Sequence, residues 1–298
     1  MPTTALHDPT PTVRRVCNGG FDLWYDRRGS GRSAVVLLSG ATLQATLWES
    51  VFTAPMVESG HTVIRIDWRD VGLSSRGDFR SAPYTLADLA DDVVAVLDGA
   101  GFAEAHVVGF SMGGLVAQHV AILDPTRVRS LTLLASGYLG GPIMGGTPRA
   151  EAVLRVLLDR VGKAGIDPIE AEVAYWRLIS GSALTYDEDR WRRRITEWIE
   201  RGHNPRCPHL RIPQHEQSLD SWLADPEARA ERVRRIDAPT LVVHGDDDGM
   251  FPPANGEALA ADICHARLRV MEGRGHDLFL DPTGEISELV LEHVAELR

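Results

Sequence analysis

Apolar runs and helical patterns alternate along the first half of the chain. Leu86–Leu97 and Leu115–Ile122 carry apolar residues at intervals of three and four, which predicts amphipathic helices. The runs between them are short and bounded by turn residues, as expected of strands buried in a parallel sheet. The predicted strands are Phe21–Tyr25, at an edge, Ala34–Leu38, Val63–Ile66, His106–Val108 and Val128–Leu134. This alternation predicts an α/β protein with a doubly wound, mostly parallel sheet.

The alternation stops after Ala135 and resumes with the predicted strands Thr240–Val243 and Leu268–Met271. Between them no run predicts a buried strand, whereas several segments carry apolar residues at helical spacing among charged ones. After a glycine-rich stretch over Gly137–Gly146, these segments are Glu151–Val161, Pro168–Ser180 and Glu188–Arg201. We therefore divide the chain into the first part of the α/β core (1–135), an inserted helical cap (136–235) and the second part of the core (236–298).

The most specific motif is Gly-x-Ser-x-Gly, over Gly109–Gly113, between a predicted strand and a predicted helix. The two glycines lack a Cβ, so the backbone can fold back sharply and lift the Ser111 hydroxyl above the edge of the sheet. A serine so placed is a candidate nucleophile. Unrelated glycine-rich turns also match this pattern, so its meaning depends on whether a base and an acid are present elsewhere.

Candidates for both partners follow later strands. A serine nucleophile needs an imidazole to take its proton and a carboxylate to orient that imidazole, and in this architecture they come in the order Asp, His. The strand Thr240–Val243 is followed by three aspartates, Asp246–Asp248, and the last strand by Glu272–Asp277, whose two glycines would let a loop carry His276 toward Ser111. We assign Ser111 as the nucleophile, His276 as the general acid and base, and one of the aspartates as its orienter.

Acyl transfer also needs donors for the oxyanion that develops on the substrate. The backbone N–H of Met112, directly after the nucleophile and at a helix start, is one candidate. The other should come from the loop after Ala34–Leu38, and there we favour the N–H of Ala41. The alternative is that Ser39–Thr42 is an ordinary turn.

Composition limits the remaining possibilities. The 298 residues are 44% hydrophobic, enough for a large core. A formal net charge of -11 argues against binding of nucleic acid or of a membrane surface. The opening residues lack the apolar core of a secretory signal, and no run approaches the roughly 18 apolar residues of a membrane span. We expect a cytoplasmic monomer or homodimer.

Cysteine and histidine usage gives no sign of a metal. Cys17, Cys207 and Cys264 are few and far apart, which suits neither a disulfide framework nor a zinc site. No cysteine or histidine cluster has the spacing of metal ligands. We therefore expect neither metal nor cofactor.

Taken together, these residues resemble the α/β-hydrolase superfamily over nearly the whole chain. The segment Asp67–Ser74 is similar to the superfamily's structural Asp-x-Arg-Gly-x-Gly-x-Ser loop, with Asp70 in place of a glycine. The superfamily spacing Gly-x-x-Asp-x-x-x-Pro fits Gly245 and Pro252 and so selects Asp248 among the three aspartates. In the oxyanion loop, this chain has Ser-Gly where the superfamily usually has His-Gly.

Three stretches further resemble the aclacinomycin methylesterase group, which trims anthracycline polyketides. They are Ala95–Gly99, His106–Gly109 and, within the predicted cap, Trp176–Gly181. The resemblance implies that the substrate is a bulky aromatic or polyketide-derived methyl ester, cleaved to an acid and methanol.

The cap should cover the candidate nucleophile and shape substrate choice. The candidate pocket residues are Thr42, Trp48, Trp176 and Phe251. We expect His119 and His244 to be core histidines, and Asp277 to be a solvated neighbour of His276.

The elbow serine leaves the reaction itself open, because the pocket and not the triad sets the chemistry on this fold. The alternatives are a cofactorless haloperoxidase-like perhydrolase, a hydrolase of lactones, thioesters or carbon–carbon bonds, and a small-molecule receptor or carrier without turnover. A fluorophosphonate, which labels an activated serine, separates the last alternative from the enzymes.

Overall fold

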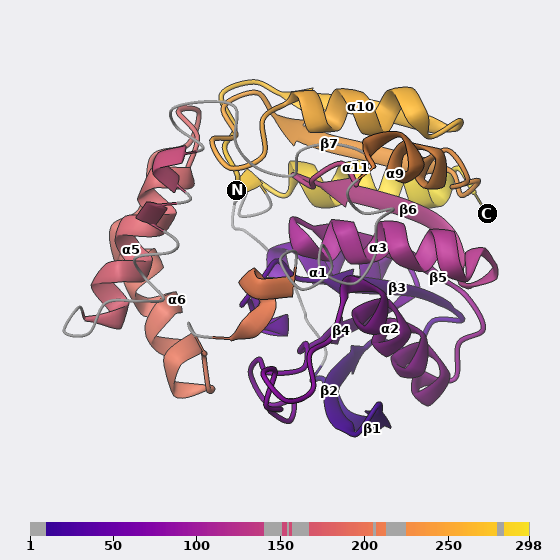
Figure 1. Cartoon of the computed structure of the whole chain (residues 1–298), viewed down its shortest axis with the longest axis horizontal. Coiled ribbons are helices and arrows are strands. Elements are labelled where there is room, and N and C mark those ends of the chain that lie inside the picture. The colour runs from indigo at the N-terminus through magenta and orange to yellow at the C-terminus, as the bar shows by residue number, and fades with distance from the viewer. Residues whose placement is uncertain are drawn as a thin grey trace.

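The computed structural model describes residues 10–139, 151–153, 155–156, 167–204, 207–212, 225–278 and 283–297. Their strands form one eight-stranded sheet in the order β1-β2-β4-β3-β5-β6-β7-β8 (Figure 1). Its strands are β1 (Thr12–Asn18), β2 (Phe21–Arg28), β3 (Ser33–Leu38), β4 (His61–Ile66), β5 (Ala105–Phe110), β6 (Val128–Leu134), β7 (Thr240–Gly245) and β8 (Ala266–Met271). Strand β2 runs antiparallel to β1 and β4, and every other pair is parallel.

Every predicted strand is present, but the predicted edge is wrong. Strand β2, which contains Phe21–Tyr25, lies inside the sheet, because β1 pairs with it along Thr12–Asn18. Most side chains of β1 are exposed, Val13 by 49%. A strand with so little burial carries no apolar alternation, so the sequence pattern gave no sign of it.

Helices cover both faces of the sheet, as the doubly wound prediction requires. Along β3 successive side chains alternate between the faces: Val36 and Leu38 belong to one apolar cluster, and Val35 and Leu37 to the other. The first cluster includes residues of α2 (Leu86–Ala100), α3 (Met112–Leu123), α9 (Pro226–Val233) and α10 (Ala254–Asp262), and the second those of α1 (Ser50–Glu58) and α11 (Glu285–Ala295). Within the ranges given above, no helix has the length and apolar character that a bilayer crossing requires.

Between β6 and β7 the described residues form helices and no strand. They include α5 (Pro168–Ile179), α6 (Glu188–Glu200) and the short helix η3 (Pro208–Arg211). Helices α5 and α6 pack together, with Trp176 stacked on Trp191 at 4.2 Å between ring centroids, and they stand to one side of the sheet (Figure 1). Two of the predicted cap helices are thus confirmed. The third is helical at 151–153 and 155–156, and the rest of it and most of the glycine-rich stretch lie outside the described residues.

The sheet topology brings distant segments to one edge. The chain leaves β3 for β4 on one side and returns to β5 on the other, so β3 and β5 flank a topological switch point, where open α/β sheets bind ligands. The loop with Ala41 follows β3, and Ser111 follows β5. Asp248 and His276 follow β7 and β8, at the same edge because these strands are parallel.

Candidate active site

Ser111 occupies a strained turn between β5 and α3. Its φ of 55° and ψ of −121° are disfavoured for any residue with a side chain. The turn is tight: a Cβ on Gly109 would lie 2.4 Å from the Gly113 carbonyl oxygen, and one on Gly113 would lie 2.2 Å from that of Leu38. Only glycine fits either position, which is the physical basis of the Gly-x-Ser-x-Gly pattern.

The three predicted catalytic side chains lie within hydrogen-bond distance of one another. His276 Nε2 is 3.0 Å from Ser111 Oγ, and His276 Nδ1 is 2.8 Å from Asp248 Oδ2. The second carboxylate oxygen of Asp248 accepts the backbone N–H groups of Met250 and Phe251, at 2.8 and 2.9 Å. Because a carboxylate can only accept, His276 carries its proton on Nδ1, and its Nε2 is free to accept from the serine.

The His276 imidazole is confined by its surroundings. The side chains of Phe110 and Phe251 contact it, with ring centroids at 5.0 and 5.3 Å. Its backbone N–H donates to the carbonyl of Ile179, at the end of α5, at 2.9 Å. His276 is only 2% exposed, and in such a site hydrogen bonds are stronger than in water.

The backbone N–H groups of the two predicted oxyanion donors have no acceptor in the described part of the chain. Among the described residues nothing accepts a hydrogen bond from the N–H of Ala41 or of Met112. The start of α3 packs directly on the end of β3, because a Cβ on Gly113 would also lie 2.7 Å from the Ser39 carbonyl oxygen. Both predicted oxyanion donors therefore belong to segments in contact at the elbow, and their role stays a prediction.

A histidine of the predicted cap, which the sequence analysis missed, holds the loop that contains the predicted oxyanion donor Ala41. His209, in η3, is 2% exposed. Its Nδ1 accepts the Thr42 N–H at 3.2 Å, and its Nε2 donates to the Arg69 carbonyl at 3.1 Å. Both bonds go to backbone groups, so no sequence motif could have indicated them.

A second connection from the cap reaches the same loop through Gln44. Its amide donates to the Trp198 carbonyl at 2.7 Å, and its side-chain oxygen accepts from Arg201 at 2.8 Å. Arg201 also pairs with the buried Asp67 at 2.7 Å, whose carboxylate accepts the Ala45 N–H at 2.7 Å. Side chains of the cap thus fix the loop at two points.

The burial of His209 predicts a pH-dependent stability. Burial lowers the pKa of His209 from 6.5 to about 4. Between these values the unfolded chain binds a proton there that the folded chain does not, so the free energy of unfolding falls as the pH falls. Relative to His209→Gln, which cannot titrate, the wild type should lose about 2 kcal/mol between pH 7 and pH 5. Urea unfolding at both pH values measures this difference, and parallel pH dependences would contradict it.

Asp277 is not the solvated neighbour that we expected. It is 6% exposed, and its carboxylate contacts the Ser180 hydroxyl at 2.6 Å and the Gly181 N–H at 3.3 Å. Burial raises the pKa of Asp277. The expectation was wrong because the end of α5 closes over the His276 loop, so closely that a Cβ on Gly275 would lie 2.2 Å from the Gly181 nitrogen.

Removing the Asp277 carboxylate should loosen this junction. Asp277→Ala leaves the Ser180 hydroxyl and the Gly181 N–H without that acceptor. We therefore expect the free energy of unfolding to fall by about 2 kcal/mol. A thermal or urea denaturation series with Asp277→Ala, Ser180→Ala and the double variant measures the coupling of the pair. Fully additive effects would show that the contact contributes nothing.

The structure places the four candidate pocket residues in different surroundings. Phe251 contacts His276, and Thr42 lies in the oxyanion loop. Trp48 packs on Phe52 with ring centroids at 4.8 Å, and Trp176 packs on Trp191, both in the aromatic core shared by cap and sheet. Whether any of them contacts a substrate stays a prediction.

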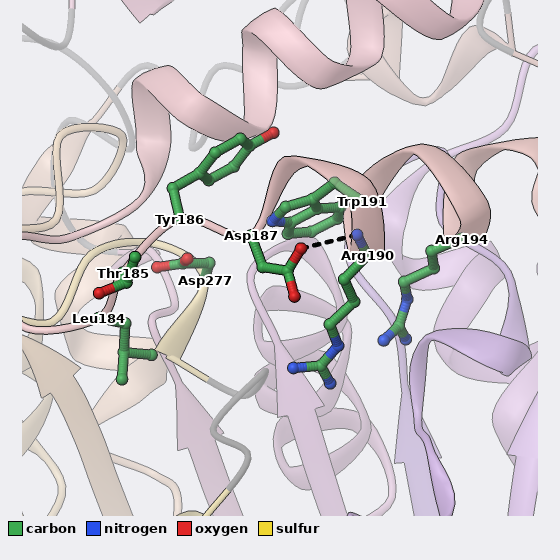
Figure 2. Close-up of a pocket in the computed structure, with 8 residues that line it drawn as sticks. All are labelled: Leu184, Thr185, Tyr186, Asp187, Arg190, Trp191, Arg194 and Asp277. Carbon is green, nitrogen blue, oxygen red and sulfur yellow. Dashed lines mark hydrogen bonds between the residues drawn. The ribbon is translucent and has the colours of Figure 1, made fainter.

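A cavity of about 530 Å³ opens between the cap and the His276 loop (Figure 2). Its lining is Leu184, Thr185, Tyr186, Asp187, Arg190, Trp191, Arg194 and Asp277. Asp187 caps α6 by accepting the Arg190 N–H at 2.9 Å, and Arg190 pairs with Glu49 of the core at 2.6 Å. The cavity thus combines aromatic and charged groups. One of its lining residues, Asp277, directly follows His276 in the chain.

The two expected core histidines are confirmed as such. His119 Nδ1 contacts the Leu115 carbonyl at 3.0 Å, and His244 Nε2 donates to the Phe251 carbonyl at 2.8 Å. Burial lowers the pKa of both. They are neutral groups that help to order the core and the loop around Asp248.

A doubly wound sheet with a serine at a strand-to-helix elbow, and Asp and His after later strands, defines the α/β-hydrolase class. The chain matches the Alpha/beta hydrolase family over residues 35–289, and it belongs to that family. This confirms the predicted fold class.

Two relatives and one solved structure are informative. The rhodomycin D methylesterases DnrP of Streptomyces peucetius and DauP of Streptomyces sp. (strain C5) are each 31% identical to this chain, over 94% of it and 97% of their own length. Est816, described as an N-acyl homoserine lactone degrading enzyme, is 28% identical, with a TM-score of 0.72 over 94% of this chain and 99% of Est816. The predicted resemblance to anthracycline methylesterases is confirmed.

Proposed function

We propose that this protein is a serine hydrolase that cleaves a carboxylic ester through an acyl-enzyme. The observation that carries the proposal is the position of the His276 imidazole, 3.0 Å from the Ser111 hydroxyl and 2.8 Å from the Asp248 carboxylate. This arrangement can deprotonate a serine at neutral pH and then return the proton to a leaving group.

In the proposed first half-reaction, the Ser111 oxygen attacks the ester carbonyl as His276 Nε2 takes its proton. The N–H groups of Ala41 and Met112 donate to the oxyanion of the tetrahedral intermediate. His276, held by Asp248, then protonates the departing alcohol. In the second half a water molecule repeats the sequence on the acyl-enzyme and releases the acid.

For the substrate, we propose a methyl ester of a bulky aromatic or polyketide-derived molecule. The two methylesterases that match over nearly the whole chain support this choice. The lining of the cavity beside Asp277 includes neither Ser111 nor His276, so the proposal places there only the part of such a molecule that is remote from the ester. Lactone hydrolysis is the second candidate, supported by the similarity to Est816, because a cyclic ester needs the same nucleophile and donors.

The test is a substrate panel combined with labelling of the serine. We expect the protein to release methanol from methyl esters of polycyclic aromatic acids with a higher kcat/KM than it shows on p-nitrophenyl acetate or on an acyl homoserine lactone. A fluorophosphonate should modify Ser111, detected by peptide mass spectrometry. If Ser111 is labelled but only the lactone is turned over, the second candidate replaces the first. If Ser111 stays unlabelled and no substrate is cleaved, the protein is not a serine hydrolase.

A further inference from the structure

His209 joins the cap to the loop that carries the proposed oxyanion donor. Each of its ring nitrogens has a single assigned role: Nδ1 accepts the Thr42 N–H, and Nε2 donates to the Arg69 carbonyl. An N–H can only donate and a carbonyl can only accept, so these two bonds define one neutral tautomer. Burial, which lowers the pKa of His209 to about 4, keeps the ring in that neutral form at neutral pH.

Thr42 needs such a partner because its backbone is strained. Its φ is 68°, a region that residues with a branched side chain rarely adopt. Thr42 is also buried, so water is poorly placed to satisfy its N–H, and an unpaired buried N–H is costly. The bond from His209 therefore offsets part of the free-energy cost of a backbone conformation that is unfavourable for threonine.

The peptide plane that this bond fixes is the one that joins Ala41 to Thr42. The Ala41 N–H belongs to the preceding plane, which joins Gly40 to Ala41, and the two planes meet at the Ala41 Cα. Holding the second plane through the Thr42 N–H therefore limits how far the Ala41 backbone can shift, and with it the direction of the Ala41 N–H. A donor is effective only when it already points at the place where the oxyanion forms. The Thr42 N–H is meanwhile occupied, which leaves the Ala41 N–H as the donor of this loop.

We propose that His209 is a positioning residue for the oxyanion hole, acting from the cap through Thr42. This inference rests on the proposed function, since it assigns a partner to the Ala41 donor of that reaction. It means that the cap contributes to the chemical step by holding one catalytic loop in place, besides covering the site.

Three substitutions separate the two bonds of His209. The side-chain oxygen of asparagine falls where His Nδ1 lies, so His209→Asn can still accept from Thr42 but loses the bond to Arg69. The amide nitrogen of glutamine reaches where His Nε2 lies, so His209→Gln can still donate to Arg69 but leaves Thr42 without its acceptor. His209→Ala removes both bonds.

We expect kcat on p-nitrophenyl acetate to fall about 10-fold to 100-fold in His209→Ala and His209→Gln, less than the ~10²- to 10³-fold loss on deleting an oxyanion donor. His209→Asn should stay within about threefold of the wild type, and KM should change little in all three, since the loss is confined to the transition state. Phenylboronic acid, whose tetrahedral serine adduct resembles the intermediate, should bind more weakly to the alanine and glutamine variants in the same proportion.

His203→Ala is the matched control. The His203 side chain is also buried, but its partner is Glu172, in the same segment, at 3.3 Å. Within the described part of the chain, the His203 side chain makes no hydrogen bond to the loop that carries Ala41. It should keep the wild-type kcat even if it lowers the melting temperature.

The possible outcomes are distinct. The inference is supported if kcat is highest in the wild type, next highest in His209→Asn, and lowest in His209→Gln and His209→Ala. Equal losses in all three variants, or losses that follow the melting temperature and appear equally in His203→Ala, would show that His209 only stabilises the fold. Unchanged kcat in every variant overturns the inference while the proposed function stands. A wild type that cleaves no ester overturns both.

Discussion

Replacing Ser111 with alanine is expected to lower kcat for ester hydrolysis on the order of 10⁶-fold, the loss seen when the nucleophile of a triad is removed. The proposed reaction has no other group that could form the acyl-enzyme, since His276 Nε2 faces the Ser111 oxygen at 3.0 Å. What remains should be slow attack by water, assisted by the oxyanion donors.

The same substitution should leave the fold and substrate binding intact. Alanine, like serine, has a Cβ, so the strain at a φ of 55° is unchanged. We expect the melting temperature to shift by a few degrees at most and the dissociation constant of an ester substrate, measured by calorimetry, to change less than about threefold. Fluorophosphonate labelling should be lost.

Ser130→Ala is the control for this experiment. Ser130 is also a buried serine, in β6, and its hydroxyl contacts His106 Nδ1 at 2.7 Å, away from the elbow. It should retain labelling and turnover. A Ser111→Ala protein with near wild-type kcat, freed of contaminating esterase by purification from an inactive host background, would refute the assignment.

The sequence predicted the parallel part of the sheet well, because strands such as Ala34–Leu38 are buried on both faces and read as continuous apolar runs. It failed at β1, whose side chains are mostly exposed. The helices of the cap were predicted from their spacing, but not their pairing through Trp176 and Trp191, because stacking between helices leaves no pattern along the chain.

For the candidate site, the meeting of Ser111, Asp248 and His276 could be predicted because each lies in the turn or loop that follows a strand, in a local motif with a chemical reason. The supporting contacts could not. His209 acts on backbone groups, and Asp277 is buried only because the end of α5 covers it. Such contacts join segments far apart in sequence, and a single chain without its fold does not reveal them.

The surroundings of Asp248 allow a sharper prediction than its distance to His276 alone. Its two oxygens have different partners: one accepts the N–H groups of Met250 and Phe251, and the other accepts from His276. In Asp248→Asn, the amide oxygen must keep the place opposite the two N–H donors, because an amide nitrogen there would face two further donors. The amide nitrogen then points at His276 Nδ1.

An imidazole facing that NH₂ group must accept on Nδ1 and therefore carry its proton on Nε2, where it cannot take the proton of Ser111. We expect kcat to fall about 10⁴-fold, the effect of the wrong tautomer in serine proteases, while the two retained backbone bonds keep the melting temperature near that of the wild type.

Asp247→Asn is the control for this experiment. The Asp247 carboxylate accepts the Ser182 N–H at 2.9 Å at the exposed rim, so activity should change by no more than about threefold. Steady-state kinetics of both variants, with the Nε2 proton followed by NMR, decides the matter. A large loss in Asp247→Asn beside an active Asp248→Asn would mean that the wrong aspartate has been assigned, and full activity in both variants would mean that His276 needs no orienting carboxylate.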